Sequence, residues 1–445
     1  MVIFARRGGI FCPLHKFDLN FTKSTMKNAN KVSRSFQHMI LLCGCLLIYY
    51  SVSARQHKPT ESGYIAQKTQ GIDSDYVLIF NSYSESAPWC RSLVDSTVMD
   101  LIKLSPQTMT VTQNLNSGLL RDEKALAQLR QQVDVSYHDK PRMIIYIGST
   151  SWPFLHETIE KKWGKVPSII FSDIDYTGPI TNLLRKTPIA PALRIPYDKI
   201  VKEYEGALSV VYMPIYLRQS LALMHQLTPP MTELCFISDT RWISAQMRAD
   251  MAAITKTDFP ELKVRYLISA DMSTLDLLDS LQHYGQETGV LFFSWLKQSQ
   301  VGDSFVNDSH FRIIISKSAR QPLFVLNDNE VNTDSDVLGG YFPTRAAVSH
   351  HIRLALEKTL AGQPGSFQTV EPAQPVIDYL TLIRKGISPD LLPSNTHIYW
   401  KPDNFFHQYR YLLGGGALIV AVLLLIIYFL SRSRTQQRKV LTYMA

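Results

Sequence analysis

Short apolar runs rich in β-branched and aromatic residues alternate with longer amphipathic stretches along most of the chain. The runs have the length of strands, and several are apolar throughout, which is typical of strands buried on both faces of a sheet. In the first half of the chain, strands are predicted at 75–82, 108–114, 142–149 and 167–173. Apolar residues recur at helical spacing between them, which predicts helices at 88–104 and 121–133.

The alternation starts again after a proline-containing link at 190–199. Further strands are predicted at 233–239, 263–269, 289–295 and 321–328, with helices at 241–256 and 273–284. Strands that are joined by helices pair in parallel through right-handed crossovers. Two such series predict an α/β protein with two doubly wound lobes, each built on a parallel sheet.

A run of twenty uncharged residues, 411–430, lies near the C-terminus. At about 1.5 Å per residue, a helix of this length covers the roughly 30 Å hydrocarbon core of a bilayer. Four basic residues and no acidic residue follow in 431–445, so the positive-inside rule places that tail in the cytoplasm. The alternative is a buried helix in a soluble core, which apolar residues on every face disfavour. We expect a transmembrane helix at 411–430.

A second apolar run, 39–54, follows a basic N-terminus at 1–38. The run is short for a membrane span, so it is predicted to be either an uncleaved anchor or a signal peptide cut after Val52-Ser53-Ala54. The segment that begins at Met26 has the form of a normal signal n-region, so translation is expected to start at Met1 or at Met26. Whether this apolar segment is cleaved or kept as an anchor, the middle of the chain is expected outside the cytoplasm.

The positive charge of the chain is concentrated at its two ends. The whole chain carries +8, of which 1–38 contributes +6 and 431–445 contributes +4, leaving about −2 for all other residues. A nucleic-acid partner is not expected, because no excess of basic residues remains to form such a surface. Between the apolar runs we expect a linker at 55–74, a bilobal ligand-binding domain at 75–400 and a juxtamembrane segment at 401–410.

The motifs of common enzymes and metal sites are missing from the sequence. There is no CxxC pair, HExxH, G-x-S-x-G elbow or phosphate-binding loop, so no catalytic residue, cofactor or metal is expected. The adjacent His350 and His351 point to different sides of a helix and could not share a metal. Cys90 and Cys235 are the cysteines of the predicted domain, and two buried free thiols are favoured over a disulfide.

Polar and aromatic residues stand where several predicted strands end. In open α/β sheets, ligands bind outside the carboxyl ends of the strands, so these side chains predict a cleft between the two lobes. The alternative for each residue is that it caps the helix that follows. The residues that we predict to bind a ligand are Ser82, Tyr83, Ser149, Thr150, Asp173, Asp239, Trp242 and Trp295. Hydroxyls and acids can hydrogen-bond polar ligand groups, and Tyr and Trp provide flat apolar walls.

The stretch 321–367 resembles the signature of the ABC-transporter substrate-binding-like family, whose domains have the type I periplasmic-binding-protein fold. The matching features are Pro322, Asp328, the pair Gly339-Gly340, a helix at 344–360, and a turn at 362–364. The following segment, 386–413, is similar to the one that joins such a domain to the membrane in bacterial sensor histidine kinases. The resemblance covers roughly 75–411 and implies membrane-anchored ligand sensing. The chain departs from those kinases after residue 430, because no phospho-acceptor or ATP-binding box fits there.

The resemblance and the residues together predict the sensor part of a two-component system, in the inner (cytoplasmic) membrane with its main domain periplasmic. The kinase module is absent from this chain, so a cytoplasmic kinase or other transmitter protein is an expected partner, unless the chain is a truncated kinase. We also expect a homodimer, because 414–416 are glycines and small residues allow close helix packing in lipid. The alternative function is a membrane-tethered solute-binding protein that serves an ABC importer.

Overall fold

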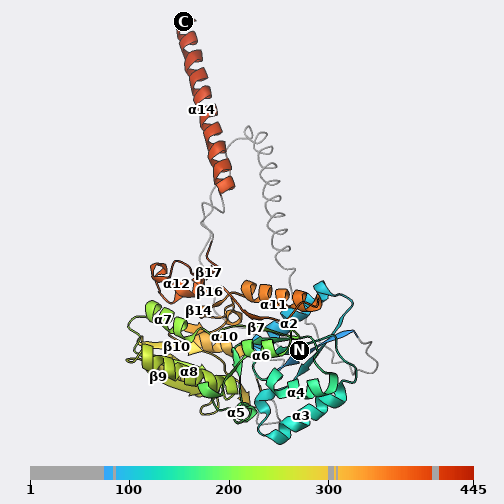
Figure 1. The fold of residues 1–445 in the computed structure, drawn as a ribbon. Coiled ribbons are helices and arrows are strands. Elements are labelled where there is room, and N and C mark those ends of the chain that lie inside the picture. Colours follow the sequence, from blue (N-terminus) through green and yellow to red (C-terminus); the bar gives the residue numbers. More distant parts are fainter. Residues whose placement is uncertain (1–74, 84–86, 299–304, 307–308, 403–409, 445) are drawn as a thin grey trace, which may run out of the picture. The chain divides into compact units, whose positions relative to one another are not determined.

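The computed structural model describes residues 75–83, 87–298, 305–306, 309–402 and 410–444 (Figure 1). The predicted N-terminal elements at 1–38, 39–54 and 55–74 lie outside the described residues. Two α/β lobes and a long C-terminal helix make up the described part of the chain.

The first lobe is built on a six-stranded sheet in which all neighbouring strands are parallel. The strand order is β15-β7-β4-β3-β1-β2. The strands are β1 (Tyr76–Asn81), β2 (Met109–Asn114), β3 (Met143–Ile147), β4 (Ser168–Ser172), β7 (Leu208–Tyr212) and β15 (Phe367–Thr369). Every residue of β1, β3 and β4 is buried, as expected for strands covered on both faces.

Six helices accompany this sheet. They are α2 (Pro88–Leu104), α3 (Glu123–Ser136), α4 (Ser151–Trp163), α5 (Ile180–Arg185), α6 (Tyr197–Glu203) and α11 (Arg345–Leu360). The shorter elements of this lobe are η1 (Ser117–Leu119), η2 (Pro191–Leu193) and the small antiparallel pair β5 (Tyr176–Thr177) and β6 (Ile195–Pro196). Helix α11 packs against α2, β4 and β7, so it belongs to the first lobe although it follows the strands of the second.

The second lobe has a seven-stranded sheet in the order β17-β16-β14-β13-β10-β8-β9. Its strands are β8 (Glu233–Ser238), β9 (Lys263–Ile268), β10 (Thr288–Phe292), β13 (Leu323–Val325), β14 (Val337–Pro343), β16 (Ala373–Asp378) and β17 (His397–Tyr399). We predicted a wholly parallel sheet, and this was wrong for one pair, because β14 and β16 run antiparallel. The reason is the path of the chain, which leaves β14 for α11 and β15 in the first lobe and re-enters from the opposite direction at β16.

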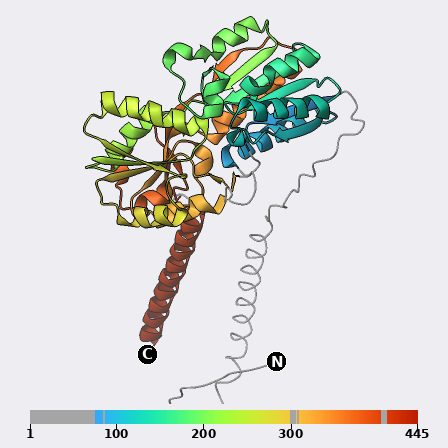
Figure 2. The same cartoon turned by 90° about the horizontal axis from the view of Figure 1, so that it is seen from below.

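Helices lie on both faces of the second sheet, which Figure 2 shows nearly edge-on. They are α7 (Leu217–Leu227), α8 (Trp242–Asp258), α9 (Thr274–His283), α10 (Ser309–Ser318) and α12 (Tyr379–Arg384), with 3-10 turns η3 (Asp328–Glu330) and η4 (Pro389–Leu391). A two-stranded pair, β11 (Lys297–Gln298) and β12 (Phe305–Val306), follows β10. The chain passes between the lobes from β7 to α7, from β14 to α11 and from β15 to β16.

Gly339 shows how closely the second sheet is packed where the chain leaves it. Its φ of 138° is in the region that glycine tolerates and other residues avoid. A Cβ at this position would lie 1.9 Å from the carbonyl oxygen of Val376 on β16. The Gly-Gly pair that carried part of the family resemblance therefore has a structural role in the pairing of β14 with β16.

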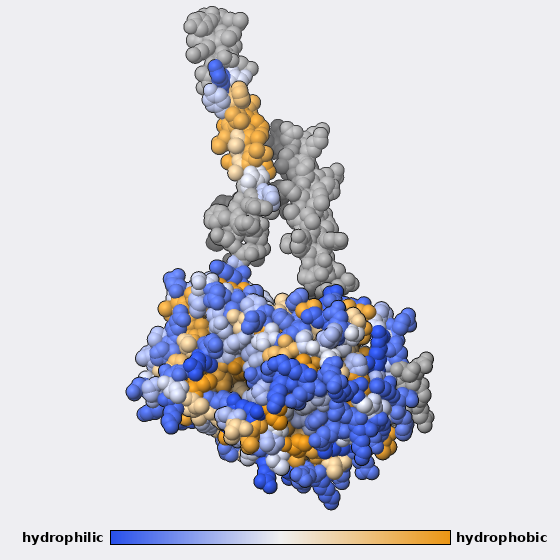
Figure 3. Space-filling model, in the orientation of Figure 1, coloured by the Kyte–Doolittle hydropathy of each residue, from blue (hydrophilic) through white to orange (hydrophobic). Residues whose placement is uncertain are grey.

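The C-terminal helix α14 (Arg410–Met444) contains the one candidate membrane span among the described residues, Gly414–Arg434. Its apolar side chains are exposed, and Figure 3 shows them as an orange band along the helix. The helix continues through the basic residues of 431–444. Its length and composition suit the predicted transmembrane segment at 411–430.

Candidate functional site

A cavity of about 180 Å³ lies between the two lobes. Its walls come from segments that follow the carboxyl ends of β1, β4, β8, β10 and β13, together with α2 and the start of α11. This is the edge at which open α/β sheets bind their ligands. The structure brings three of the eight predicted residues, Tyr83, Asp173 and Trp295, into the cavity wall. The other five are not among the residues that line it.

Ser82, Ser149 and Thr150 support the start of α4 in place of lining the cavity. The Ser82 hydroxyl accepts hydrogen bonds from the backbone N–H of Ser151 at 2.9 Å and of Thr150 at 3.3 Å. The Thr150 hydroxyl lies 2.7 Å from that of Ser117, and Ser149 is fully buried beside them. Ser82 therefore does not cap the helix that follows it, α2, but accepts from the first backbone N–H groups of α4, which is distant in the sequence.

Asp239 is completely buried and acts as an internal anchor for Arg241. Its carboxylate accepts from the Arg241 backbone N–H and from Arg241 Nε, both at 2.9 Å, and from Ser244 Oγ at 2.6 Å. A very short contact with Ser294 Oγ completes the set. Burial by itself would raise the pKa of Asp239, but Arg241 and the two hydroxyls outweigh it and hold the pKa below its usual value. The carboxylate is therefore ionised and fully used within the protein.

Arg241 is one of the cavity-lining residues that were not predicted from the sequence. Its guanidinium carbon lies 4.6 Å from the centre of the Tyr83 ring, so an arginine of the second lobe stacks on a tyrosine of the first. Nε donates to Asp239 and Nη2 donates to Ser294 Oγ at 2.6 Å, and Nη1 makes no hydrogen bond within the part of the chain that the structure describes. The sequence feature that could have indicated Arg241 is Asp239, two residues earlier. An aspartate that follows a strand commonly accepts a hydrogen bond from the backbone N–H of the residue two positions later.

Asp173, which belongs to the first lobe, places a negatively chargeable group on the cavity wall opposite in sign to Arg241 of the second lobe. It is half-buried, and its Oδ1 is buried without a hydrogen-bond partner in the described part of the chain. Burial raises the pKa of Asp173 to about 6, against the lowering effects of its own backbone N–H and of Arg241. A buried carboxylate with a raised pKa is stabilised in its ionised form by a cationic partner, because the partner's charge replaces the hydration that burial has removed.

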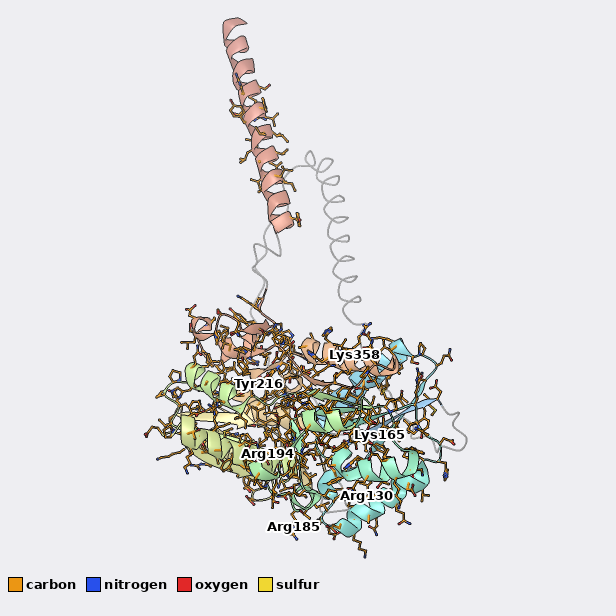
Figure 4. All side chains as sticks on the ribbon, in the orientation of Figure 1. Arg130, Lys165, Arg185, Arg194, Tyr216 and Lys358 are labelled. Atoms are coloured by element: carbon orange, nitrogen blue, oxygen red, sulfur yellow. The ribbon has the colours of Figure 1, made fainter. Side chains whose placement is uncertain are left out.

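Trp242 fastens the lobes together beside the cavity. Its indole N–H donates to the carbonyl of Thr187 at 3.0 Å, and the backbone N–H of Ile189 donates to Gln246 Oε1 at 2.8 Å. Arg194, labelled in Figure 4, forms an ion pair with Asp250 of α8 at 3.4 Å. These contacts join the segment after α5 to α8, so Trp242 contributes to lobe closure.

Aromatic side chains form the apolar part of the cavity wall. Trp89, Phe292, Trp295 and Phe342 line it, and the indole N–H of Trp295 is directed to Thr274 Oγ1 at 3.2 Å. Flat rings of this kind favour a ligand with an apolar or planar portion.

A second group of charged residues lines the cavity near the crossing from β14 to α11. Arg312 forms a 2.6 Å ion pair with Glu330, and both side chains are largely buried. Asn327 and Asp328 lie beside them, each with an Oδ1 atom that is buried and has no partner among the described residues. The cavity wall therefore carries two groups of charged and polar residues as well as aromatic rings.

Cys90 and Cys235 are free and buried, which confirms the prediction of two free thiols. Cys90 borders the cavity, and burial raises the pKa of its thiol far above the usual value. The thiol is therefore protonated and unreactive at neutral pH. Within the described residues, no three His, Cys, Asp or Glu side chains are placed to hold a metal ion.

No family model and no curated protein matches this sequence. Among solved structures, a substrate-binding protein with adhesive properties from Clostridium difficile, in its ligand-free, open form, is similar at 12% identity and a TM-score of 0.43; the match covers 74% of this chain and 100% of that chain. A Streptococcus pneumonia ABC domain in complex with L-Trp is similar at 12% identity and a TM-score of 0.44, covering 73% and 99%. A carbohydrate-transporter solute-binding protein from Agrobacterium radiobacter, in complex with D-arabinose, has 11% identity and a TM-score of 0.41, covering 69% and 95%. The two-lobed fold is assigned from the strand order of this chain itself, and the family named from 321–367 stays a prediction.

Proposed function

We propose that this chain is a membrane-anchored receptor that binds a small molecule between its two lobes and reports the binding through α14. The observation that carries this proposal is a set of buried polar atoms of cavity-lining residues that have no hydrogen-bond partner in the described part of the chain: Asp173 Oδ1, Arg312 Nε, Asn327 Oδ1 and Asp328 Oδ1. Leaving such an atom unsatisfied costs about 1–3 kcal/mol. A molecule that supplies the missing partners would bind with favourable free energy.

The charges on the wall select the chemistry of this molecule. Asp173 favours a cationic donor, and the remaining Nη1 of Arg241 favours an anionic or carbonyl acceptor. Trp89 and Trp295 favour an apolar or planar part between the polar ends. We therefore infer a compact ligand with both a cationic and an acceptor group.

Signalling would follow from a shift between open and closed arrangements of the lobes. A ligand that touches both lobes binds the closed arrangement better and increases its population. The closing contacts of Trp242, Gln246 and Arg194 with the opposite lobe make that arrangement a defined state.

Thermal stability tests the binding claim. The intact protein in nanodiscs is heated with L-tryptophan, L-arginine, putrescine, glycine betaine or D-arabinose at millimolar concentration. A compound that binds only the folded state adds RT ln(1 + [L]/Kd), about 2.7 kcal/mol at a hundredfold excess over Kd. We expect a cationic member to raise the melting temperature of the wild type and of the neighbouring control Asp175→Asn, but not of Asp173→Asn. Equal shifts in all three proteins would place the binding outside this cavity.

Membrane topology is a separate prediction. With 75–402 outside and 431–445 in the cytoplasm, protease added to intact cells should digest the lobes and spare an epitope fused after Ala445. Permeabilised cells provide the control, since the epitope is then digested as well. Loss of the epitope in intact cells would reverse the proposed orientation.

An importer-linked role, the alternative function, would instead be supported by co-purification with a transporter that hydrolyses ATP.

A further inference from the structure

Asp328 uses its two carboxylate oxygens in different ways. It is the first residue of η3, directly after β13 and Asn327, and only 4% of its surface is exposed. Oδ2 accepts a hydrogen bond from the hydroxyl of Tyr399 at 2.7 Å and a short one from the backbone N–H of Arg345. Asp328 is one of the residues that line the cavity, and its Oδ1 is buried and has no partner among the described residues.

The residues that share Oδ2 come from three separate parts of the structure. Asp328 belongs to the second lobe, and Arg345 opens α11 of the first lobe just after the chain crosses between them. Tyr399 ends β17, the last strand before the C-terminal helix. One carboxylate therefore connects the cavity, a crossing point between the lobes, and the segment that leads to α14.

β17 is suited to respond to a change at Asp328. Among the described strands it lies at the edge of the sheet and pairs with β16 alone, through the three residues His397–Tyr399. The next residue, Trp400, has a φ of 52°, a left-handed conformation that is unfavourable for a tryptophan and needs support from its neighbours. The Tyr399 ring lies against the Trp400 ring at a tilt of 37°, with 5.1 Å between centroids, so holding Tyr399 also holds the residue that turns the chain.

Tyr399 remains a hydrogen-bond donor over the physiological pH range. Burial, followed by the neighbouring Asp328, raises its pKa to about 12. The Arg345 guanidinium lies 5.4 Å from the same ring and 3.7 Å from Asp328 Oδ2, which keeps a positive charge beside the carboxylate.

We propose that Asp328 binds a hydrogen-bond donor of the ligand through Oδ1 and transmits occupancy of the cavity to the juxtamembrane segment through its bond with Tyr399. This inference rests on the proposed receptor function and adds the path by which the lobes would act on α14. A ligand donor at Oδ1 fixes the orientation of the carboxylate, and with it the position of Tyr399 and the end of β17. Movement of the lobes about the crossing at Pro343–Arg345 acts on the same atom through the Arg345 backbone.

A covalent lock between the lobes tests the transmission without any ligand. Ser92 of α2 donates to Asn329 of η3 at 3.1 Å, so the double substitution Ser92→Cys and Asn329→Cys offers a site for a disulfide or a short bis-maleimide bridge. The full chain, with Cys12, Cys43 and Cys45 changed to serine, is placed in nanodiscs and bridged. Deuterium exchange is then measured for a peptide covering 396–402.

Bridging is expected to slow exchange in this peptide at least fivefold. Asp328→Asn and Tyr399→Phe should each reduce the effect to less than twofold, whereas the exposed control Asp334→Asn should keep it. An unchanged effect in both Asp328→Asn and Tyr399→Phe, or no effect of bridging in the double-cysteine protein that carries neither of these changes, would overturn the proposed path. Tyr399→Phe keeps the test valid if Asp328→Asn does not fold.

The five thermal-shift compounds separate ligand contact from transmission. A compound that stabilises the wild type should lose most of its shift in Asp328→Asn and keep it in Tyr399→Phe, because only the former changes the cavity. If bridging slows exchange at 396–402 but no compound stabilises the protein, the proposed ligand class is contradicted and the Asp328 path is not. If a compound binds but bridging leaves the exchange unchanged, the Asp328 path is contradicted and the ligand proposal is not.

Discussion

Asp239→Ala is expected to destabilise the protein by about 3–5 kcal/mol, the cost of leaving one member of a buried ion pair without its partner. Arg241 would lose both its bond to the Asp239 carboxylate and the acceptor that fixes its backbone N–H. Ser244 and Ser294 would lose the same acceptor. The guanidinium would then stay buried against Tyr83 without a compensating charge.

Chemical denaturation of the intact protein, followed by tryptophan fluorescence, measures this loss. Asp271→Ala is the matched control, because Asp271 is exposed in the same lobe, and we expect a change within about 0.5 kcal/mol. Asp239→Asn tests the charge separately, since it retains an oxygen acceptor but not the negative charge. A loss below about 1 kcal/mol for Asp239→Ala would mean that Arg241 does not depend on this carboxylate.

Asp173→Asn is expected to increase the stability of the unliganded protein while weakening ligand binding. The pKa of Asp173 is raised in the folded state to about 6 from an ordinary 3.8, so the folded protein holds this proton more tightly than the unfolded chain. Stability therefore falls as pH rises from about 4 to 6 and is flat, for this group, above 6. The difference corresponds to at most about 3 kcal/mol, and about 1–3 after allowance for the partial exposure of the side chain. Asparagine removes that penalty, so the unliganded variant should be more stable than the wild type at pH 7.

The same substitution removes the charge that would hold a cationic ligand group. A charge-assisted hydrogen bond contributes about 1.5–3 kcal/mol, so affinity should fall by about tenfold to hundredfold. In the wild type, affinity for a cationic ligand should decrease about tenfold per pH unit below pH 6, as Asp173 becomes protonated. Unfolding curves from pH 4 to pH 8 measure the stability term, with Asp175→Asn as the control that should keep the wild-type slope. A variant that is less stable at pH 7 and shows the wild-type pH slope would contradict the role of this carboxyl group.

The fold was predictable because the apolar pattern matches the burial of the elements closely. The helix predicted at 88–104 is α2 with the same bounds, and the runs at 75–82 and 233–239 contain strands whose interior residues are buried. Helices α4 and α7 and strands β7 and β14 were missed although they are of ordinary length, and other missed elements are very short. β15 and β17 have three residues each, and all of these are only half-buried. The antiparallel pairing of β16 depends on how the chain re-enters the lobe, which no local pattern records.

The edge of the sheets at which the cavity lies was predictable, but the direction of each side chain was not. Ser82 and Tyr83 follow the same strand, yet the first supports α4 and the second lines the cavity, because successive side chains in a turn point different ways. Asp239 and Arg241 show the same division, with the acid turned inward and the arginine turned to the cavity. Trp242 was expected to bind a ligand and instead bonds to the opposite lobe. Local sequence does not contain these orientations, since they depend on contacts between segments that are far apart.

Native mass spectrometry tests the receptor proposal most directly. The intact protein is released from nanodiscs after incubation with a bacterial metabolite extract, alongside Asp173→Asn and Asp175→Asn. We predict one additional small-molecule mass, unaltered on release, on the wild type and on Asp175→Asn, and its absence from Asp173→Asn. A wild type that stays at its unliganded mass, or a bound mass that Asp173→Asn retains in full, would contradict the account.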